Sequence, residues 1–350
     1  MHLSTQEIRN QAGTLRLRNP SLRARELAQL LCVPEGALVA ADCGEGAMRL
    51  QSDFAAQLAA LQTLGPVMAL TRNPHAVIER VGTYRNFADF SHASQVLGEE
   101  IDLRLFLGRF HTGFAVVESG PRGEHRSLQY FDASGGAVHK IHLRPESDAA
   151  GWAAFLARFC AADQTPGQQF ALSAAPTPPR PDHEVDGDGF RAAYRQMRDT
   201  HELFGILRSF GIGRLQALRL LGPEFARPVE PLALRALLRG AAAAALPIMI
   251  FVGNQAAIQI YSGPVRTLKQ YGDWFNVMDP GFNLHLFEPG IRSAWVVRKP
   301  TADGLVSSLE LYDDWEQPLL LAFSKRKPGQ KESAQWRTLL LALATADGAA

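Results

Sequence analysis

The chain has 350 residues, 46% of them hydrophobic, which suits one or two domains of ordinary size. The 36 Lys and Arg residues nearly balance the 35 Asp and Glu residues, and no long basic run is present, so the composition argues against a nucleic-acid partner. The three cysteines, Cys32, Cys43 and Cys160, form no CxxC pair. Their odd number argues against a secreted disulfide framework and for a reducing compartment.

The beginning of the chain, "MHLSTQEIRNQAGTLRLRNP", is polar and lacks the apolar core of a signal peptide. The most apolar run, "AAAAALPIMIFVG", is too short to span a bilayer and contains Pro247. We therefore expect a cytoplasmic protein that is not embedded in a membrane.

In the first half, the sequence predicts a helix over "SLRARELAQLLCV", then short strands with a period of two. In "IDLRLFL", apolar residues from Ile101 to Leu107 alternate with Asp102, Arg104 and Phe106. Turn-length connections such as "ESGPRGEHR" favour antiparallel meanders over βαβ units. A helix around Trp152 closes this half.

The segment from Ser173 to Gly189, "SAAPTPPRPDHEVDGDG", is rich in Pro, Gly and acidic residues, which is typical of a linker. We expect a first unit over 1–173, a linker over 174–189 and a second unit over 190–350. The second unit begins with a helix that ends near Gly211 and continues with strands such as "SAWVVRK". A helix around Trp336 closes it.

The two halves resemble each other at a single offset. "GPVMALTRNPHAVIERVGTY" parallels "LPIMIFVGNQAAIQIYSGPV", "IDLRLFLGRF" parallels "FNLHLFEPGI", and "HRSLQYFD" parallels "VSSLELYD". The same offset aligns Asn73 with Asn254, Arg104 with His285, and Asp132 with Asp313. The predicted fold class is therefore α+β: a tandem repeat of two related units, each an antiparallel meandering sheet with packed helices.

One histidine stands out in "MRDTHELFGILRSFGIGR". If the segment is one helix, His201 shares an apolar stripe with Tyr194, Met197, Phe204 and Leu207, among others. A histidine in such a stripe is more often a hydrogen-bonded core residue than a ligand. The alternative is a ligand of a metal or cofactor, because neutral imidazole commonly binds iron.

Other candidates are weaker when considered alone. Arg104 and Phe106 share one strand face, and the repeat aligns them with His285 and Phe287 in the second copy. Arg104 alone also suits a solvated face. Lys299 alone suits a surface charge. The remaining histidines show no metal-binding spacing, and no GxSxG, Walker or GxGxxG motif occurs in a suitable context.

Four segments in order, "DLRLFL", "MRDTHELFGIL", "IMIFVGN" and "VRKPTADGLVSSLELYD", make the chain resemble a known family. It is similar over essentially its whole length to the hemin transport or hemin-degrading proteins of Gram-negative haem uptake, the HemS/ChuS/PhuS group. The resemblance implies a cytoplasmic haem-binding protein of two repeated halves, with haem b, as ligand or substrate, held on the C-terminal half.

The resemblance also implies functional residues. His201 matches the axial ligand of the haem iron, and Arg104, with Phe106 beside it, matches an arginine on the distal side that would be catalytic in an enzyme. The remaining matches are basic residues at the propionates, an apolar wall residue and a further basic position: Arg214 and Lys299, Phe251, and Arg326, respectively.

These residue types suit haem chemically. Aromatic side chains suit the porphyrin faces, cations suit the propionates, and an arginine, which does not lose its proton, suits a distal hydrogen-bond donor better than an iron ligand. One departure is Phe323, where the family often has Tyr, so a distal contact made by that hydroxyl is missing.

Two functions share this site. We predict a carrier in haem uptake and iron acquisition that passes haem to a haem oxygenase, with the cytoplasmic side of a haem ABC transporter as another expected partner. The alternative is a haem-degrading enzyme that opens the porphyrin and releases iron with an external electron donor, since no flavin or nicotinamide motif is visible. A pure interaction module would explain the repeat but not the His, Arg, Phe and Lys set.

Overall fold

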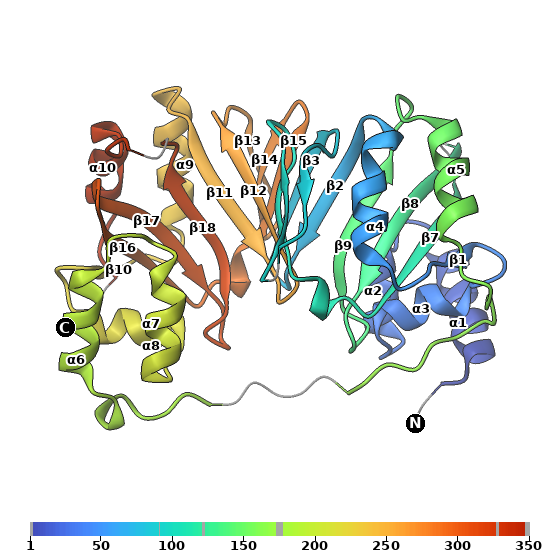
Figure 1. The fold of residues 1–350 in the computed structure, drawn as a ribbon, viewed down its shortest axis with the longest axis horizontal. Coiled ribbons are helices and arrows are strands. Elements are labelled where there is room, and N and C mark those ends of the chain that lie inside the picture. Colours follow the sequence, from blue (N-terminus) through green and yellow to red (C-terminus); the bar gives the residue numbers. More distant parts are fainter. Residues whose placement is uncertain (1–2, 91, 121–122, 173–177, 327–328, 347–350) are drawn as a thin grey trace. The chain divides into compact units, whose positions relative to one another are not determined.

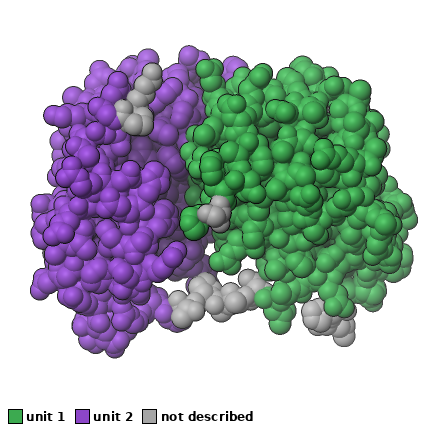
Figure 2. Space-filling model, viewed as in Figure 1, with its two compact units in different colours: residues 1–72, 79–174, 253–259 green, residues 73–78, 175–252, 260–350 purple. Residues whose placement is uncertain are grey.

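The computed structural model describes residues 3–90, 92–120, 123–172, 178–326 and 329–346. The chain forms two compact units, coloured separately in Figure 2. Unit 1 contains residues 1–72, 79–174 and 253–259, and unit 2 contains residues 73–78, 175–252 and 260–350. Each unit thus combines most of one half of the sequence with a short segment of the other half.

The elements of the first half can be followed in Figure 1. Its helices are α1 (Thr5–Arg18), α2 (Ala24–Leu30), α3 (Glu35–Ala41), α4 (Phe54–Ala60), η1 (Leu61–Leu64), η2 (Leu107–Arg109) and α5 (Ala149–Phe159). Its strands are β1 (Ala47–Arg49), β2 (Val67–Arg72), β3 (Ala76–Gly82), β4 (Phe87–Ala88), β5 (Ser94–Leu97), β6 (Asp102–Leu105), β7 (Thr112–Gly120), β8 (Gly123–Phe131) and β9 (Ala137–Leu143).

After a short helical turn, the second half repeats this order except for η1. Its helices are η3 (Asp182–Glu184), α6 (Gly187–Gln196), α7 (Glu202–Phe210), α8 (Arg214–Leu221), α9 (Ala233–Ala243), η4 (Glu288–Gly290) and α10 (Ala334–Leu341). Its strands are β10 (Ala226–Val229), β11 (Ile248–Gly253), β12 (Ala257–Gly263), β13 (Leu268–Tyr271), β14 (Trp274–Asp279), β15 (Phe282–Phe287), β16 (Ser293–Thr301), β17 (Gly304–Tyr312) and β18 (Pro318–Ser324).

Both units have the predicted antiparallel meander. In unit 1 the strand order is β1-β7-β8-β9-β2, and in unit 2 it is β10-β16-β17-β18-β11. Consecutive long strands pair directly, as β7 pairs with β8 and β16 with β17. The prediction of an α+β tandem repeat of meandering sheets is confirmed. Of the predicted linker over 174–189, residues 174–177 lie outside the described part of the chain, and residues 187–189 already form the first turn of α6.

The repeat offset recurs in the hydrogen bonds of the turns. Asp132 follows β8, and its carboxylate accepts bonds from the backbone N–H groups of Ser134 and Gly136. Asp313 follows β17 and does the same for Trp315 and Gln317. Because an aspartate that bonds the backbone two residues on fixes a turn, both copies of the motif set the connection to the next strand in the same way.

A second matched pair explains why the units exchange segments. Asn254 begins a hairpin turn and lies in unit 1, where its Nδ2 donates to the carbonyls of Arg72 (2.9 Å) and Val138 (2.8 Å). Its Oδ1 accepts from the backbone N–H groups of Ala256 and Ala257. Asn73 begins the corresponding turn, lies in unit 2, and donates to the carbonyl of Leu319 (2.8 Å). Each asparagine therefore anchors a short segment of one half within the unit formed mainly by the other.

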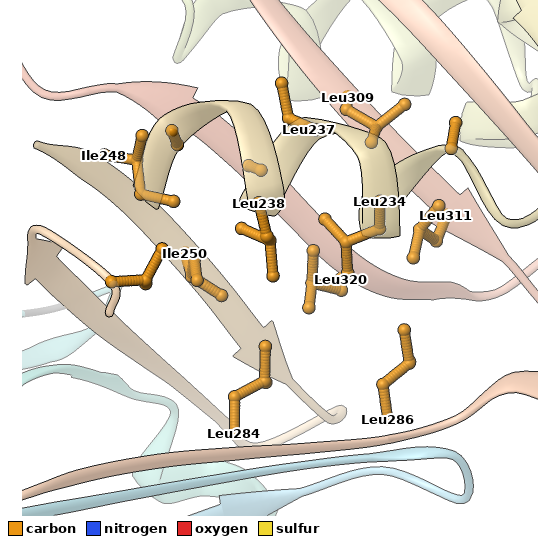
Figure 3. Close-up of a cluster of buried hydrophobic side chains, with 14 of the residues drawn as sticks. Leu234, Leu237, Leu238, Ile248, Ile250, Leu284, Leu286, Leu309, Leu311 and Leu320 are labelled. Carbon is orange, nitrogen blue, oxygen red and sulfur yellow. The ribbon is translucent and has the colours of Figure 1, made fainter. Parts of the chain in front are cut away.

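The core of unit 2 lies between α9 and the alternating apolar positions of its strands, shown in Figure 3. The labelled side chains are Leu234, Leu237, Leu238, Ile248, Ile250, Leu284, Leu286, Leu309, Leu311 and Leu320. Each is essentially inaccessible to solvent, and burial of such a side chain contributes about 1.5–3 kcal/mol. This packing leaves the opposite faces of β16, β17, β18 and β11 for other side chains.

No helix in the described part of the chain is both long and apolar enough to cross a membrane.

We predict that Asn254→Ala lowers the free energy of unfolding by about 2–6 kcal/mol, because four hydrogen bonds are lost and each contributes about 0.5–1.5 kcal/mol. Urea unfolding followed by circular dichroism measures the change. Asn10→Ala, on the exposed side of α1, is the matched control and should change stability little. Equal stability of the two variants would contradict the anchoring role.

Candidate functional site

The segment that contains His201 is not one helix, so the predicted single stripe is wrong. Helix α6 ends at Gln196, Met197 adopts an extended conformation, and α7 begins at Glu202. Tyr194 and Met197 are buried as expected, but Phe204 is 60% exposed and the side chain of His201 is 90% exposed. His201 is therefore the residue that precedes α7, and it is not a core histidine.

The sequence contains a signal for this break that the helical periodicity hides. "DTHE" places Asp199 three residues before Glu202, a spacing typical of a helix N-terminus. The carboxylate of Asp199 accepts a bond from the backbone N–H of His201 (2.8 Å), which fixes the turn before α7.

Asp199 also fixes the imidazole. His201 Nδ1 lies 2.6 Å from Asp199 Oδ1. Hydrogen bonds from the backbone and side chain of His201 lower the pKa of Asp199, so this carboxylate is ionised at neutral pH and only accepts hydrogen bonds. Nδ1 must then carry the proton, which leaves the Nε2 lone pair of a largely exposed ring for a metal. Metal-bound histidines in proteins are commonly held by a carboxylate in this way.

The loop around His201 is attached to the turn between β16 and β17. The backbone N–H of Ala302 donates to the carbonyl of Arg198 (2.8 Å). Arg326, which follows β18, forms an ion pair with Asp303 (3.2 Å), and its charge also contributes to the lowered pKa of Asp199. The structure thus brings Arg326 and His201, two of the predicted residues, to the same end of the sheet of unit 2.

The face of β11 and β18 that points away from the core is partly exposed and apolar. Met249 pairs with Phe323, and Phe251 pairs with Leu321, across the two strands. The rings of Phe251 and Phe323 pack edge to face with centroids 5.2 Å apart. We call these four residues the aromatic face. The predicted wall residue Phe251 and the departure at Phe323 therefore lie in contact.

Beside the aromatic face lies a cluster of charged residues, of which the sequence analysis identified the two cations but not the carboxylate. Lys299 of β16 is 2% exposed, and its ammonium group lies 4.9 Å from the centroid of Phe323. The same ammonium pairs with Glu310 and donates to Ser308 (3.0 Å). Arg214, the first residue of α8, donates from Nε and Nη2 to the two oxygens of Glu310, at 2.8 and 2.9 Å.

Glu310 is the buried residue that joins the two predicted cations. It lies on β17, is fully buried, and also accepts a hydrogen bond from Tyr312 (2.6 Å). Burial alone would raise its pKa, but the charges of Arg214 and Lys299 hold that pKa well below its usual range. The period-two pattern of "SSLELYD" places Ser308, Glu310 and Tyr312 on one side of β17, so alternation could have singled out Glu310 as a carboxylate on the face opposite Leu309 and Leu311.

Burial has the opposite outcome for Lys299. Loss of solvent lowers its pKa to about 8, the charge of Glu310 acts to raise it, and the charge of Arg214 lowers it further. The ammonium form therefore depends on the neighbouring carboxylate.

Arg104 and Phe106 belong to unit 1. Arg104 lies on β6, where its guanidinium forms an ion pair with Asp102 and is partly exposed. The backbone N–H of Phe106 donates to the carbonyl of Ala256 (2.8 Å). The roles of these two residues stay predictions.

These elements define a class: a tandem-repeat α+β protein whose second unit combines a carboxylate-held histidine, an aromatic face and a buried cation pair. The sequence pattern of the Haemin-degrading HemS.ChuX domain family matches residues 32–159 and 211–343. The chain belongs to this family.

Relatives extend over nearly the full chain. The hemin transport protein HmuS of Yersinia pestis is 38% identical over 333 residues, which cover 95% of this chain and 96% of that protein. The crystal structure of holo-PhuS, a heme-binding protein from Pseudomonas aeruginosa, has a TM-score of 0.95 and 43% identity, covering 98% of this chain and 100% of that one. The heme degrading enzyme ChuS of Escherichia coli O157:H7 has a TM-score of 0.91 and 34% identity, covering 97% and 100%.

We predict that the contribution of Lys299 to the free energy of unfolding becomes more favourable as pH rises. Its folded pKa of about 8 lies below the ordinary 10.5, so the unfolded chain binds more protons between these values. The free energy of unfolding of the wild type, minus that of Lys299→Met, should therefore increase by about 1.4 kcal/mol per pH unit in this window and stay flat below it. Urea titrations from pH 7 to 10 measure the difference, and a constant value would contradict the assignment.

Proposed function

We propose that the chain binds haem b on unit 2, with His201 as the axial ligand of the iron. The observation that carries the proposal is the exposed imidazole whose Nδ1 is held by Asp199, which leaves Nε2 available. Haem supplies an iron that takes such a ligand and a flat apolar ring bearing two carboxylates. Membership of the family and the names of the relatives, which include hemin transport and heme-binding proteins, support this choice.

The residues of unit 2 fit the remaining parts of the ligand. Phe251 and Phe323 offer apolar ring surface that is partly exposed without a ligand. Arg214 and Lys299 supply positive charge for the propionates, and charge-assisted hydrogen bonds of this kind contribute about 1.5–3 kcal/mol each. Arg326 adds a cation near Asp199. The hydrogen bond from His201 to Asp199 holds the ring in one orientation and makes Nε2 a better donor of its lone pair.

Within haem uptake and iron acquisition, we propose that the protein is a cytoplasmic carrier that delivers haem to a haem oxygenase. Its expected source is the cytoplasmic side of a haem ABC transporter. A single neutral histidine suits a ligand that must be held and then released to an acceptor. Two relatives that match nearly the whole chain carry the name hemin transport protein, which supports transport.

Haem degradation is the second candidate. A relative that matches 96% of the chain at 34% identity is described as an Escherichia coli heme oxygenase. In that reaction haem would be the substrate, Arg104 would be the catalytic distal group with Phe106 beside it, and electrons would come from an external donor.

We predict that His201→Ala loses most high-affinity hemin binding while the protein stays folded, because the side chain is 90% exposed. Hemin titration followed at the Soret band measures the loss, and unfolding experiments check the fold. His183→Ala is the matched control, since His183 is also exposed and next to a carboxylate, Glu184. A wild-type spectrum and affinity for His201→Ala would show that the ligand is another residue.

To distinguish a carrier from an enzyme, we test whether bound haem is degraded. We predict that haem bound to the protein stays intact and transfers to an added haem oxygenase. The haem complex is supplied with a reductant, oxygen and catalase, which removes free peroxide that bleaches haem, and the Soret band and released iron are followed. Repeated turnover to a defined tetrapyrrole with stoichiometric iron release would establish the enzyme instead. Arg104→Ala should then abolish turnover, whereas Arg126→Ala, which removes a similar ion pair on β8, should not.

A further inference from the structure

A buried carboxylate next to the cations proposed to bind propionates needs an explanation. Glu310 accepts hydrogen bonds from Arg214, Lys299, Ser308 and Tyr312, and no part of its side chain is exposed. An anion at this position would be expected to compete with an anionic ligand for the same donors. The geometry of the donors decides whether it competes with the ligand or prepares the site for it.

The first half of the chain shows the same position without equivalents of Arg214 and Lys299; the cation opposite it, Lys140 on β9, pairs with Glu35 instead. The repeat offset that aligns Asp132 with Asp313 aligns Gln129 with Glu310 and Glu118 with Lys299. Gln129 is buried on β8 and donates to Ser127, just as Ser308 bonds to Glu310 on β17. The sheet therefore accepts an uncharged Gln at this position, and the carboxylate is present in the copy where β16 carries a lysine.

Glu310 does not occupy every donor of the two cations. It uses the Nε and Nη2 edge of the Arg214 guanidinium, which also bonds to Tyr312. The Lys299 ammonium has three hydrogens, two of which point to Glu310 and Ser308. Its remaining side faces the ring of Phe323, which belongs to the partly exposed aromatic face.

The net charge of the cluster also favours binding of an anionic ligand. Two cations around one ionised carboxylate have a net charge of +1, so the cluster still attracts an anion. Without Glu310, Lys299 would be a buried ammonium group beside the guanidinium of Arg214. Burial and like charge both favour its neutral form. A neutral amine would bind a ligand carboxylate far more weakly than an ammonium group does, because it has no charge to attract it.

We propose that Glu310 is a positioning residue for a carboxylate-bearing ligand: it is the counter-ion of the buried Lys299 ammonium and fixes the Arg214 guanidinium, so that both cations are held in place for the carboxylate. This inference rests on the proposed function, in which the carboxylates are the haem propionates. In this role Glu310 is a permanent counter-ion that holds the two cations in place for the ligand. It does not compete with the ligand carboxylate for them.

The inference predicts how affinity depends on pH. The titratable groups that face Glu310 are Lys299 from β16, Arg214 from α8, Tyr312 from its own strand and Tyr194 from α6. Burial raises the pKa of both tyrosines, and the charge of Glu310 raises the pKa of Arg214, so these three do not titrate between pH 6 and 9. Lys299, with a pKa of about 8, is the group that changes charge there.

The test uses protoporphyrin IX, which lacks iron, so that ligation by His201 does not contribute to the pH dependence. Its affinity for the wild-type protein is measured by fluorescence from pH 6 to 9 and should fall as pH rises through about 8. In Glu310→Gln the midpoint should move about one to three pH units lower, because a close opposite charge shifts a pKa by that amount. The dimethyl ester of protoporphyrin IX, which has no carboxylates, should show neither the step nor the shift.

Two variants separate positioning from simple stability. Glu310→Asp keeps the charge and should restore a midpoint near that of the wild type. Glu332→Gln removes another buried carboxylate, which bonds to Ser307 on the same strand and is not bonded to Lys299, and should leave the midpoint unchanged. If Glu310→Gln does not fold, Arg214→Gln combined with Glu310→Gln removes both partners of the buried pair and should still lower the midpoint.

An unchanged midpoint in folded Glu310→Gln, or the same step with the dimethyl ester, would overturn the inference. So would tighter binding by Glu310→Gln at every pH, which is the result expected of a competitor. Failure of the proposed function is a different result: neither hemin nor protoporphyrin IX would bind the wild-type protein.

Discussion

The buried carboxylate of Glu310 is the interaction on which the functional part of unit 2 depends. It joins α8 through Arg214, β16 through Lys299 and its own strand through Ser308 and Tyr312. Removing three charges from water costs several kcal/mol per ion, and the cost is offset only where every charged group has partners of opposite sign and good geometry. Arg214 meets that condition with two parallel bonds to the carboxylate, which also fix the start of α8. The helices that precede the sheet are thereby held against the same strand face that carries the cations.

The two faces of this sheet have separate tasks because strand side chains alternate. Leu309 and Leu311 of β17 face α9 and α10 and stabilise the unit. Ser308, Glu310 and Tyr312 point the other way. A change on the second face can therefore alter ligand chemistry while the core keeps its packing. The repeat illustrates this separation, since the first half keeps Leu128 in its core but carries Gln129 next to it.

His201 is positioned by hydrogen bonds within a loop and not by a buried ion pair. Its ring is exposed on a connection between two helices, where backbone and side chain both bond to Asp199. The connection is attached to the turn after β16 at Ala302, three residues beyond Lys299. A ligand residue on a loop gains its precision from such attachments, because a loop has little packing of its own. Arg326 and Asp303 add an ion pair at the same point.

The sequence by itself determined the repeat, the antiparallel meanders and the closing helices, because these depend on local periodicity and on turn residues such as Asp132 and Asp313. It also singled out His201, Lys299 and Arg214 through family resemblance. Only the tertiary structure decided that His201 precedes a helix, since one helical period runs through Met197 into Phe204 and hides the break made by Asp199. Only the tertiary structure showed that Glu310 joins Arg214 to Lys299 and that Asn254 anchors its turn within unit 1. The bonds from Arg214 to Glu310 and from Asn254 to Arg72 join residues more than ninety positions apart, and alternation along one strand gives the direction of a side chain but not the partner it meets.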